Sequence, residues 1–225
     1  MIPEAVVGAN GEAAIVTFDD HVNVVQEFTT DADAISNIFR QLKPADNRGG
    51  RMIDAVEEAL KLLANRPGPR RANILIIGES RDRGSEEKLS DLLAEIQRTG
   101  VTLYSLTYSA YLTPFTTKAG DYTPPDGGGL LTAITETSRL AKRNTAEALT
   151  NITGGRQLKF ETKSKLENDL MRLGNEIHSR YFISFTPDLT QTPNFHHLEV
   201  RIKDRRDAVI RTQPGYWAGL GGAGK

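Results

Sequence analysis

The stretch ANILIIGESRDRGSEEKL, residues 72–89, decides the fold of this chain. Residues 73–77 are apolar apart from Asn73, a pattern typical of a strand that is covered on both faces in a parallel sheet. A charged loop follows, and Ser85 is a candidate N-cap for the next helix, whose leucines and isoleucine recur at helical spacing. A buried strand, a polar loop and an amphipathic helix in this order predict an α/β unit. In such units, ligands bind at the carboxyl ends of the strands.

The same alternation of strands and helices extends in both directions from this stretch. Upstream, two β-rich runs joined by an Asp-His turn predict a hairpin, and Thr30 is a candidate N-cap for the helix that follows. The patterns place strands at 13–18, 22–28, 101–107 and 156–160, and helices at 31–42, 52–65, 85–99, 130–151 and 164–179. This alternation predicts an α/β, Rossmann-like fold: a doubly wound, mostly parallel sheet with helices on both faces.

The sequence changes character after residue 180. Three segments without an intervening helix, 181–185, 196–202 and 208–212, are strand-like, and the chain ends in a glycine-rich tail. We therefore predict an α/β domain over residues 1–180 and a small β extension with a flexible tail over residues 181–225.

The composition excludes several classes of function. The chain has 28 basic and 29 acidic residues and a net charge of -1, so no overall positive field favours nucleic-acid binding. It contains no cysteine, which excludes disulfides, thiolate zinc sites and cysteine nucleophiles. The apolar runs are far shorter than the ~20 residues that span a bilayer, and the N-terminus lacks the pattern of a signal peptide. We expect no membrane insertion, and the sequence leaves the compartment open.

Four phrases resemble the von Willebrand factor A (VWFA) family. They are AAIVTFDDHVNVVQEFT (13–29), GGRMIDAVEEAL (49–60), ILIIGESRD (74–82) and the closing segment from YFISF to PGYWA (181–218). The last is similar to the end of a bacterial group of VWFA-related proteins, so the resemblance covers nearly the whole chain. It implies a VWFA-type fold, an interaction or adhesion function, and an extracytoplasmic setting.

The first strand and first helix of the VWFA family have no counterpart here. They need roughly 25 to 30 residues with their connections, more than the chain has before residue 13. Because the uncovered edge of a central strand promotes aggregation, we expect that the start is truncated. A sheet that closes in a different way is the alternative.

The resemblance also implies a metal site, from which this sequence departs. In the family, an Asp-x-Ser-x-Ser loop, a Thr and an Asp hold a divalent cation; here that loop motif is absent, Arg51 stands at the Thr, and Glu79 stands at or near the Asp. We expect a degenerate site without a cofactor, while Mg²⁺ held by Glu79 and Asp82 is an alternative. We hypothesise that Arg51 reaches Glu79 in place of the cation, and that the site is structural or recognises an acidic partner.

A long loop, residues 108–129, is predicted to lie on the same face. Loops of this length are often lids or binding loops, and this one carries Tyr108, Tyr111, Phe115 and Tyr122. Exposed aromatic residues are typical of interaction hot spots, although they also serve to anchor a loop to the body. The sequence predicts a non-catalytic protein-protein interaction module, with an unidentified protein partner. The candidate binding residues comprise these aromatics with Arg51, Glu79, Arg81, Asp82 and Arg83.

A serine hydrolase is the alternative function. GESRD imitates the Gly-x-Ser-x-Gly nucleophile elbow, with Ser80 as nucleophile and a downstream base among His178, His196 and His197. Asp82 in place of the last glycine and a helix that starts only near Ser85 oppose this interpretation. A Ser80→Ala variant and a serine-directed probe discriminate the two functions.

Overall fold

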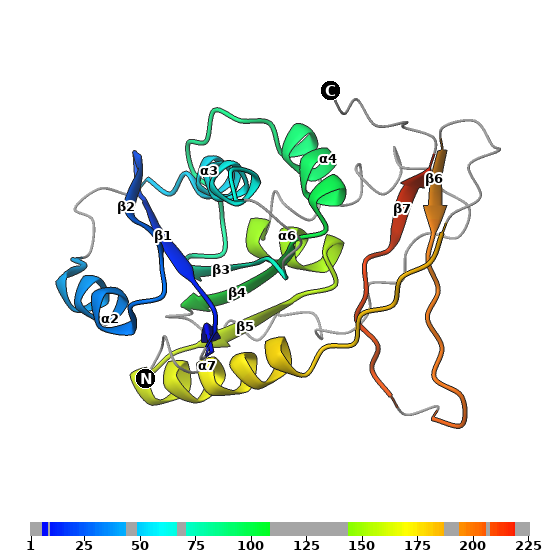
Figure 1. Ribbon diagram of the computed structural model, residues 1–225. Coiled ribbons are helices and arrows are strands. Elements are labelled where there is room, and N and C mark those ends of the chain that lie inside the picture. The colour runs from blue at the N-terminus through cyan, green and yellow to red at the C-terminus, as the bar shows by residue number, and fades with distance from the viewer. Residues whose placement is uncertain are drawn as a thin grey trace.

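The computed structural model describes residues 6–8, 10–43, 49–66, 71–108, 144–186, 194–205 and 208–218. Its elements follow the chain in this order: β1 (Ala13–Phe18), β2 (Val22–Thr29), α2 (Ala32–Gln41), α3 (Met52–Ala64), β3 (Asn73–Gly78), α4 (Leu89–Thr99), β4 (Thr102–Tyr108), α6 (Thr145–Ile152), β5 (Arg156–Phe160), α7 (Lys163–His178), β6 (Asn194–His197) and β7 (Gly215–Ala218). Figure 1 shows the β1–β2 hairpin on one side of a central sheet and the β6–β7 hairpin on the other.

The central sheet has three parallel strands in the order β3-β4-β5. Its ladders pair Asn73 with Thr102 at one end and Tyr108 with Phe160 at the other. β4 is buried from Thr102 to Thr107, because it has a strand on each side and helices above and below. β3 is as apolar as β4, yet only Ile76 of β3 is buried.

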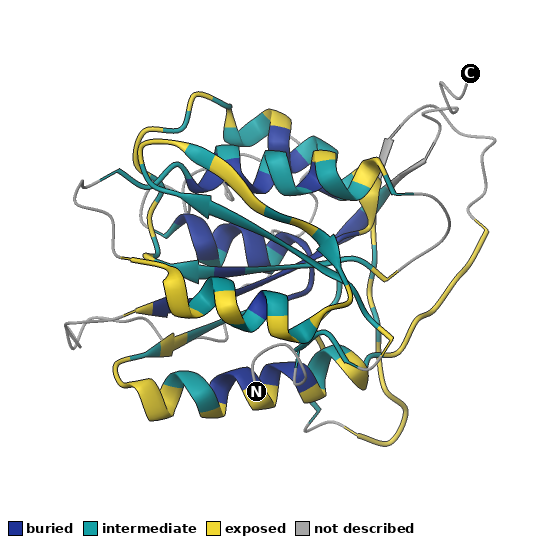
Figure 2. Cartoon of the chain, turned by 60° about the vertical axis from the view of Figure 1, so that its left-hand side comes forward, coloured by how far each residue is buried: buried dark blue, intermediate teal, exposed yellow. Residues whose placement is uncertain are grey.

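Helices cover both faces of this sheet (Figure 2). Neighbouring residues of a strand point to opposite faces. Ile76 and Leu103 point toward α3, α4 and α6 and join the main hydrophobic core with residues of those helices. Tyr104 and Leu106 point to the other face, where α7 lies and contributes the buried Leu170. The predicted α/β class, with a parallel sheet and helices on both faces, is confirmed.

The β1–β2 hairpin has the predicted antiparallel pairing, with Val16 opposite Val24 and Phe18 opposite Val22. Helix α2 packs against β2, and its Ile35 is buried. Among the strands that the structure describes, β1 pairs only with β2, and β3 pairs only with β4. The sheet is therefore split between β1 and β3.

Two predicted helix starts are wrong. Helix α2 is capped by Asp31 instead of Thr30: the Asp31 carboxylate accepts hydrogen bonds from the N–H groups of Asp33 and Ala34, at 2.9 and 3.0 Å. Helix α4 begins at Leu89, four residues after Ser85. The Ser85 side chain does not cap α4, because it is bonded to the loop and to α3, as described below.

The C-terminal region has fewer strands than predicted. β6 and β7 pair antiparallel, but residues 181–186 and 208–213 belong to no strand of the described structure. A segment rich in β-branched and aromatic residues tends to be extended, but it forms a strand only if it also pairs with a neighbouring strand. For α6, the structure describes Thr145–Ile152, and the rest of the predicted helix, residues 130–143, lies outside the described residues. No helix in the described part of the chain is long and apolar enough to cross a membrane.

Candidate functional site

Three segments meet at the carboxyl end of the parallel sheet. We call residues 49–54, 79–88 and 144–147 together the platform. Gly50 and Arg83 exchange two backbone hydrogen bonds, of 3.0 and 2.9 Å, which join the loop before α3 to the loop after β3. The N–H of Ala146 donates to the carbonyl of Ser80 at 3.1 Å, which joins that loop to the start of α6. Backbone bonds therefore fix the three segments relative to one another.

Asp82 is the centre of this platform. Its carboxylate accepts hydrogen bonds from the N–H of Ile53 (3.0 Å) and the hydroxyl of Ser85 (2.6 Å), while its own N–H donates to Thr145 Oγ1 (2.9 Å). The Ser85 oxygen in turn accepts from the N–H of Asp54 at 3.2 Å. A helix leaves its first N–H groups without partners inside the helix. Asp82 and Ser85 therefore cap α3 from a loop about thirty residues further along the chain.

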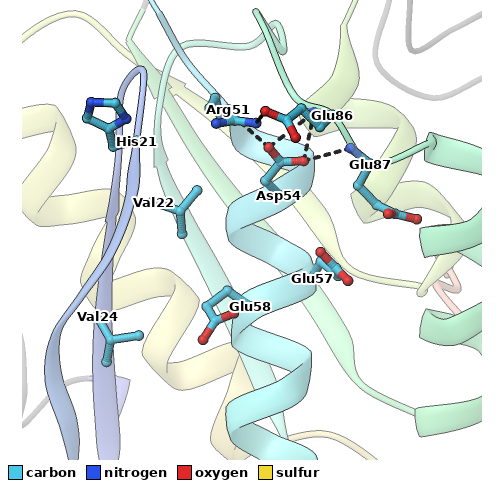
Figure 3. A pocket seen from close by; sticks show the side chains of 9 residues that line it. All are labelled: His21, Val22, Val24, Arg51, Asp54, Glu57, Glu58, Glu86 and Glu87. Carbon is cyan, nitrogen blue, oxygen red and sulfur yellow. Dashed lines mark hydrogen bonds and ion pairs between the residues drawn. The ribbon is translucent and has the colours of Figure 1, made fainter.

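The predicted pair between Arg51 and Glu79 is wrong. The Arg51 guanidinium instead binds Asp54 through Nε at 2.7 Å and Glu86 through Nη2 at 2.6 Å (Figure 3). Glu79 pairs with Arg83 at 3.0 Å, and both side chains are largely exposed. Asp54 and Glu86 carry the carboxylates that the fold brings closest to Arg51. Asp54 lies one helical turn away, and Glu86 lies on the facing loop.

The structure describes some of the other predicted binding residues and leaves the rest outside the described residues. Arg81 and Arg83 are exposed on the platform, whereas the carboxylate of Asp82 accepts hydrogen bonds within it. Tyr108 is the last residue of β4 and not part of a loop. The residue is 53% exposed, and the centroid of its ring lies 5.7 Å from that of Phe160. The remaining candidates, Tyr111, Phe115 and Tyr122, lie outside the described residues.

An acidic groove of about 670 Å³ borders the platform. One wall is formed by the turn and first residues of β2, with His21, and the other by α3 and the loop that follows β3 (Figure 3). Its charged side chains are those of Asp54, Glu57, Glu58, Glu86, Glu87 and Arg51. Five carboxylates against one guanidinium give this groove a negative potential, even though Arg51 neutralises part of it.

Asp54 is held as a carboxylate by its neighbours. Burial alone raises its pKa, but the N–H groups of Glu87 and Glu86 and the charge of Arg51 outweigh burial, so that the pKa lies below its ordinary value of 3.8. The carboxylate oxygens are 2.9 to 3.2 Å from those two N–H groups.

The stabilisation from Asp54 is expected to disappear in acid. Because its pKa is lower in the folded than in the unfolded chain, the carboxylate stabilises the fold above about pH 4, and this contribution is lost as the pH falls through the folded pKa. Asp54→Asn lacks this dependence. The difference in the free energy of unfolding between wild type and Asp54→Asn, measured by urea unfolding, should therefore shrink between about pH 5 and about pH 2.5. A difference that stays constant over this range contradicts the assignment.

The oxygen ligands that the described residues offer at this end of the sheet do not fit a hard cation. Mg²⁺ needs several converging oxygens that are free to bind it. Here Asp82 accepts from Ile53 and Ser85, and Arg51 occupies the carboxylates of Asp54 and Glu86. In the residues that the structure describes, no three histidine or acidic side chains are grouped as metal ligands.

Among the described residues, Ser80 and the candidate bases do not have the arrangement of a hydrolase site. The loop after β3 runs for ten residues before α4 begins at Leu89, so Ser80 does not lie on a sharp turn from strand to helix. His178 ends α7 two residues before Arg180, which bonds to Thr102 at the amino end of β4, whereas Ser80 is at the carboxyl end. His196 lies in the C-terminal hairpin, where its ring stacks on Tyr216 at 5.3 Å.

Sequence reasoning missed several residues of the platform. Asp54, Ser85, Glu86 and Thr145 form many of its hydrogen bonds, and only Ser85 was predicted to bond to the start of a helix, although to α4 and not to α3. Asp54 also had a detectable signal, because it follows Arg51 by three residues and so lies on the same side of a helix.

Comparisons with known proteins support the fold. No family model and no curated protein matches this chain. Among solved structures, the conserved hypothetical protein BatB from Bacteroides thetaiotaomicron is similar at a TM-score of 0.52 and 10% identity, over 80% of this chain and 84% of that chain. An aerotolerance-related membrane protein from Bacteroides fragilis is similar at a TM-score of 0.53 and 13% identity, over 80% and 85% of the two chains.

A third similar structure carries the family name. It is a von Willebrand factor type A protein from Catenulispora acidiphila, with a TM-score of 0.51 and 13% identity, over 78% of this chain and 35% of that chain. At these identities the similarity concerns the fold. This chain has a von Willebrand factor A-like α/β fold.

Proposed function

We propose that this chain is a non-catalytic protein-interaction module that binds its partner through the platform, without a metal ion. The observation that supports this most is the set of hydrogen bonds around Asp82, which holds three segments in one arrangement before any partner arrives. A surface that is ordered in advance loses little conformational entropy on binding. The VWFA-like fold agrees with such a role, because open α/β sheets bind ligands at the carboxyl ends of their strands.

The partner is proposed to carry a basic side chain. Arg51 was expected to attract an acidic group, but its charge is used by Asp54 and Glu86. The groove beside it has an excess of carboxylates. Among them, Glu58 lies on the wall formed by α3 and forms no ion pair within the described residues. A lysine or arginine of the partner would complement this groove. The exposed Tyr108 would supply apolar contact at the neighbouring strand end.

Site-specific photo-crosslinking tests where the partner binds. A photoreactive amino acid placed at Arg81 or Tyr108 should trap one partner protein from an extract of the source cells. The matched control is the same amino acid at Arg98, which is exposed at the far end of α4. Equal trapping at all three positions, or trapping only at Arg98, contradicts the proposal.

Titration of the trapped partner then tests the chemistry. Tyr108→Ala and Glu58→Lys are each expected to weaken binding by about tenfold or more, because hot-spot residues contribute on the order of 2 kcal/mol. Glu167→Lys, a similar change on the exposed side of α7, is expected to have little effect. Binding should persist in EDTA. This mode of recognition is ruled out if EDTA abolishes binding of the partner, or if neither substitution changes its affinity.

A further inference from the structure

We propose that the amino end of the parallel sheet binds the diphosphate group of a ligand. The residues that hold this group are Arg71, Arg180, Arg211 and Tyr104. The site lies beyond the amino ends of β3 and β4, at the opposite end of these strands from the platform. Arg71 precedes β3, Arg180 follows α7, and Arg211 precedes β7. The three guanidinium groups therefore come from segments that are far apart in the chain.

Arg180 is the centre of this site. Its Nη1 donates a hydrogen bond to Thr102 Oγ1 at 2.5 Å, at the start of β4. Its guanidinium carbon lies 5.9 Å from the centre of the Tyr104 ring, on the same strand. The side chain is partly buried, and these two contacts hold its guanidinium at the strand end before a ligand binds.

Arg71 lies at the neighbouring strand end. The N–H of Thr102 donates to the carbonyl of Ala72 at 3.2 Å, so the residue after Arg71 is bonded to the residue that binds Arg180. The Arg71 guanidinium stacks on the ring of Phe182, with 4.5 Å between the guanidinium carbon and the ring centre. Arg71 and Arg180 also line a common cavity. The two positive charges are therefore close enough to act on one ligand.

Arg211 approaches the same end from the C-terminal segment. The next residue, Thr212, lies against Gly154 in the turn before β5: a Cβ on this glycine would be 2.5 Å from the carbonyl carbon of Thr212. β5 begins beside Tyr104 in the ladder with β4. Arg211 therefore lies at the end of the sheet where Arg180 is held, on the side of β5.

The Tyr104 hydroxyl is a donor without an acceptor. Tyr104 is fully buried, and its hydroxyl has no hydrogen-bond partner among the described residues. Burial raises the pKa of this hydroxyl, while the charges of Arg180 and Arg211 act against the rise, so both guanidinium groups lie near it. A buried polar group without a partner is costly and indicates a missing one. A phosphate oxygen bound by these arginines would accept the hydrogen bond.

The charges at this end of the sheet are unbalanced. Within the described residues, neither Arg71 nor Arg180 nor Arg211 forms an ion pair. The nearby carboxylate of Glu176 is already bound to Arg156 at 3.0 Å. A partly buried guanidinium without a counter-ion is unfavourable. One carboxylate neutralises a single charge, whereas a diphosphate carries several charges and offers oxygens to several arginines at once. The site therefore favours a diphosphate.

Isothermal titration calorimetry with inorganic pyrophosphate tests the site on the whole chain. We expect saturable binding of one pyrophosphate per chain, at an ionic strength held constant with sodium chloride. ADP carries the same group on a nucleoside. ADP that binds tighter by about tenfold or more identifies a nucleotide as the ligand, and similar affinities identify a free diphosphate. Malonate, a dicarboxylate, should bind more weakly; equal binding of malonate overturns the assignment to phosphate.

Arginine variants locate the site. Arg180→Gln should weaken pyrophosphate binding by about tenfold or more, because charge-assisted hydrogen bonds are lost. Arg98→Gln, at the exposed end of α4, is the matched control and should have no effect. Circular dichroism establishes that the variants are folded. In case Arg180→Gln does not fold without its bond to Thr102, Arg211→Gln is the second test, since Arg211 is exposed.

Tyr104→Phe distinguishes a ligand site from a structural role. The substitution removes only the hydroxyl, which has no partner in the described structure, so the free energy of unfolding without ligand should not fall. Pyrophosphate binding should weaken by about threefold to tenfold. A hydroxyl with a purely structural role gives the opposite pattern, a loss of stability at unchanged affinity, and that pattern contradicts the proposal.

Other results would also overturn the proposal. They are the absence of saturable binding, and binding that neither Arg180→Gln nor Arg211→Gln weakens. Equal weakening by Arg98→Gln would show that the anion binds to positive surface in general. Platform variants such as Glu58→Lys should leave pyrophosphate binding unchanged, so this proposal and the proposed function fail independently.

Discussion

Leu93→Ala is expected to lower the free energy of unfolding by about 3 to 4 kcal/mol. Leu93 is fully buried on α4, in the core that α3, α4 and α6 share with the sheet. Truncation removes apolar contacts and leaves a cavity. Helices α3 and α6 and the sheet cannot move far enough to close it, because each is fixed by its own connections and packing. Urea unfolding followed by circular dichroism measures the effect as a shift in midpoint at constant slope.

Leu42→Ala is the matched control for this prediction. Leu42 follows α2 and is 42% exposed, so the same change of side chain should cost less than about 1 kcal/mol. Similar losses at the two positions would show that α4 does not pack as described. A loss at Leu93 accompanied by a lower slope would indicate that the variant has lost cooperative unfolding.

Asp82→Ala is expected to lower the free energy of unfolding by about 2 to 3 kcal/mol. The substitution leaves the N–H of Ile53 and the hydroxyl of Ser85 without their acceptor, in a partly buried place. It also removes a negative charge from the positive end of α3. The measurement is again urea unfolding, with amide exchange at Ile53 as the local reporter.

Two matched variants separate the reasons for this loss. Asp82→Asn keeps an oxygen acceptor without the charge and should cost roughly half as much. Glu79→Ala removes an exposed partner of Arg83, three residues earlier in the same loop, and should cost less than about 0.5 kcal/mol. If Glu79→Ala proves as costly as Asp82→Ala, the loop is not organised around Asp82.

The fold could be predicted from local patterns because the decisive elements are strongly periodic. Leu92, Leu93 and Ile96 lie at helical spacing in the sequence, and all three are buried. The apolar run 73–77 became a strand of a parallel sheet. The ends of elements were harder, since Thr30 and Asp31 are both good capping residues and only the backbone decides which one caps α2. The C-terminal strands depended on pairing partners that a linear pattern does not specify.

The site was predicted less well, because its contacts join positions far apart in the chain. The platform was placed at the correct end of the sheet, since strand order alone determines which loops meet there. The partner of each charge was not predictable in the same way. Arg51 had several carboxylates within reach, and the choice of Asp54 and Glu86 over Glu79 follows from the path of the loop after β3. Asp82 was predicted to contact a partner, but its carboxylate caps α3.

The remote cap of α3 has a consequence for the order of folding. The residues that complete its first turn follow it by 29 and 31 positions, and the loop that carries them is placed only when β3 and α6 have docked. The first turn of α3 should therefore be among the last parts to form, while its apolar middle can pack early. Asp82→Ala is then expected to accelerate unfolding and to leave the folding rate almost unchanged, which gives a φ-value near zero.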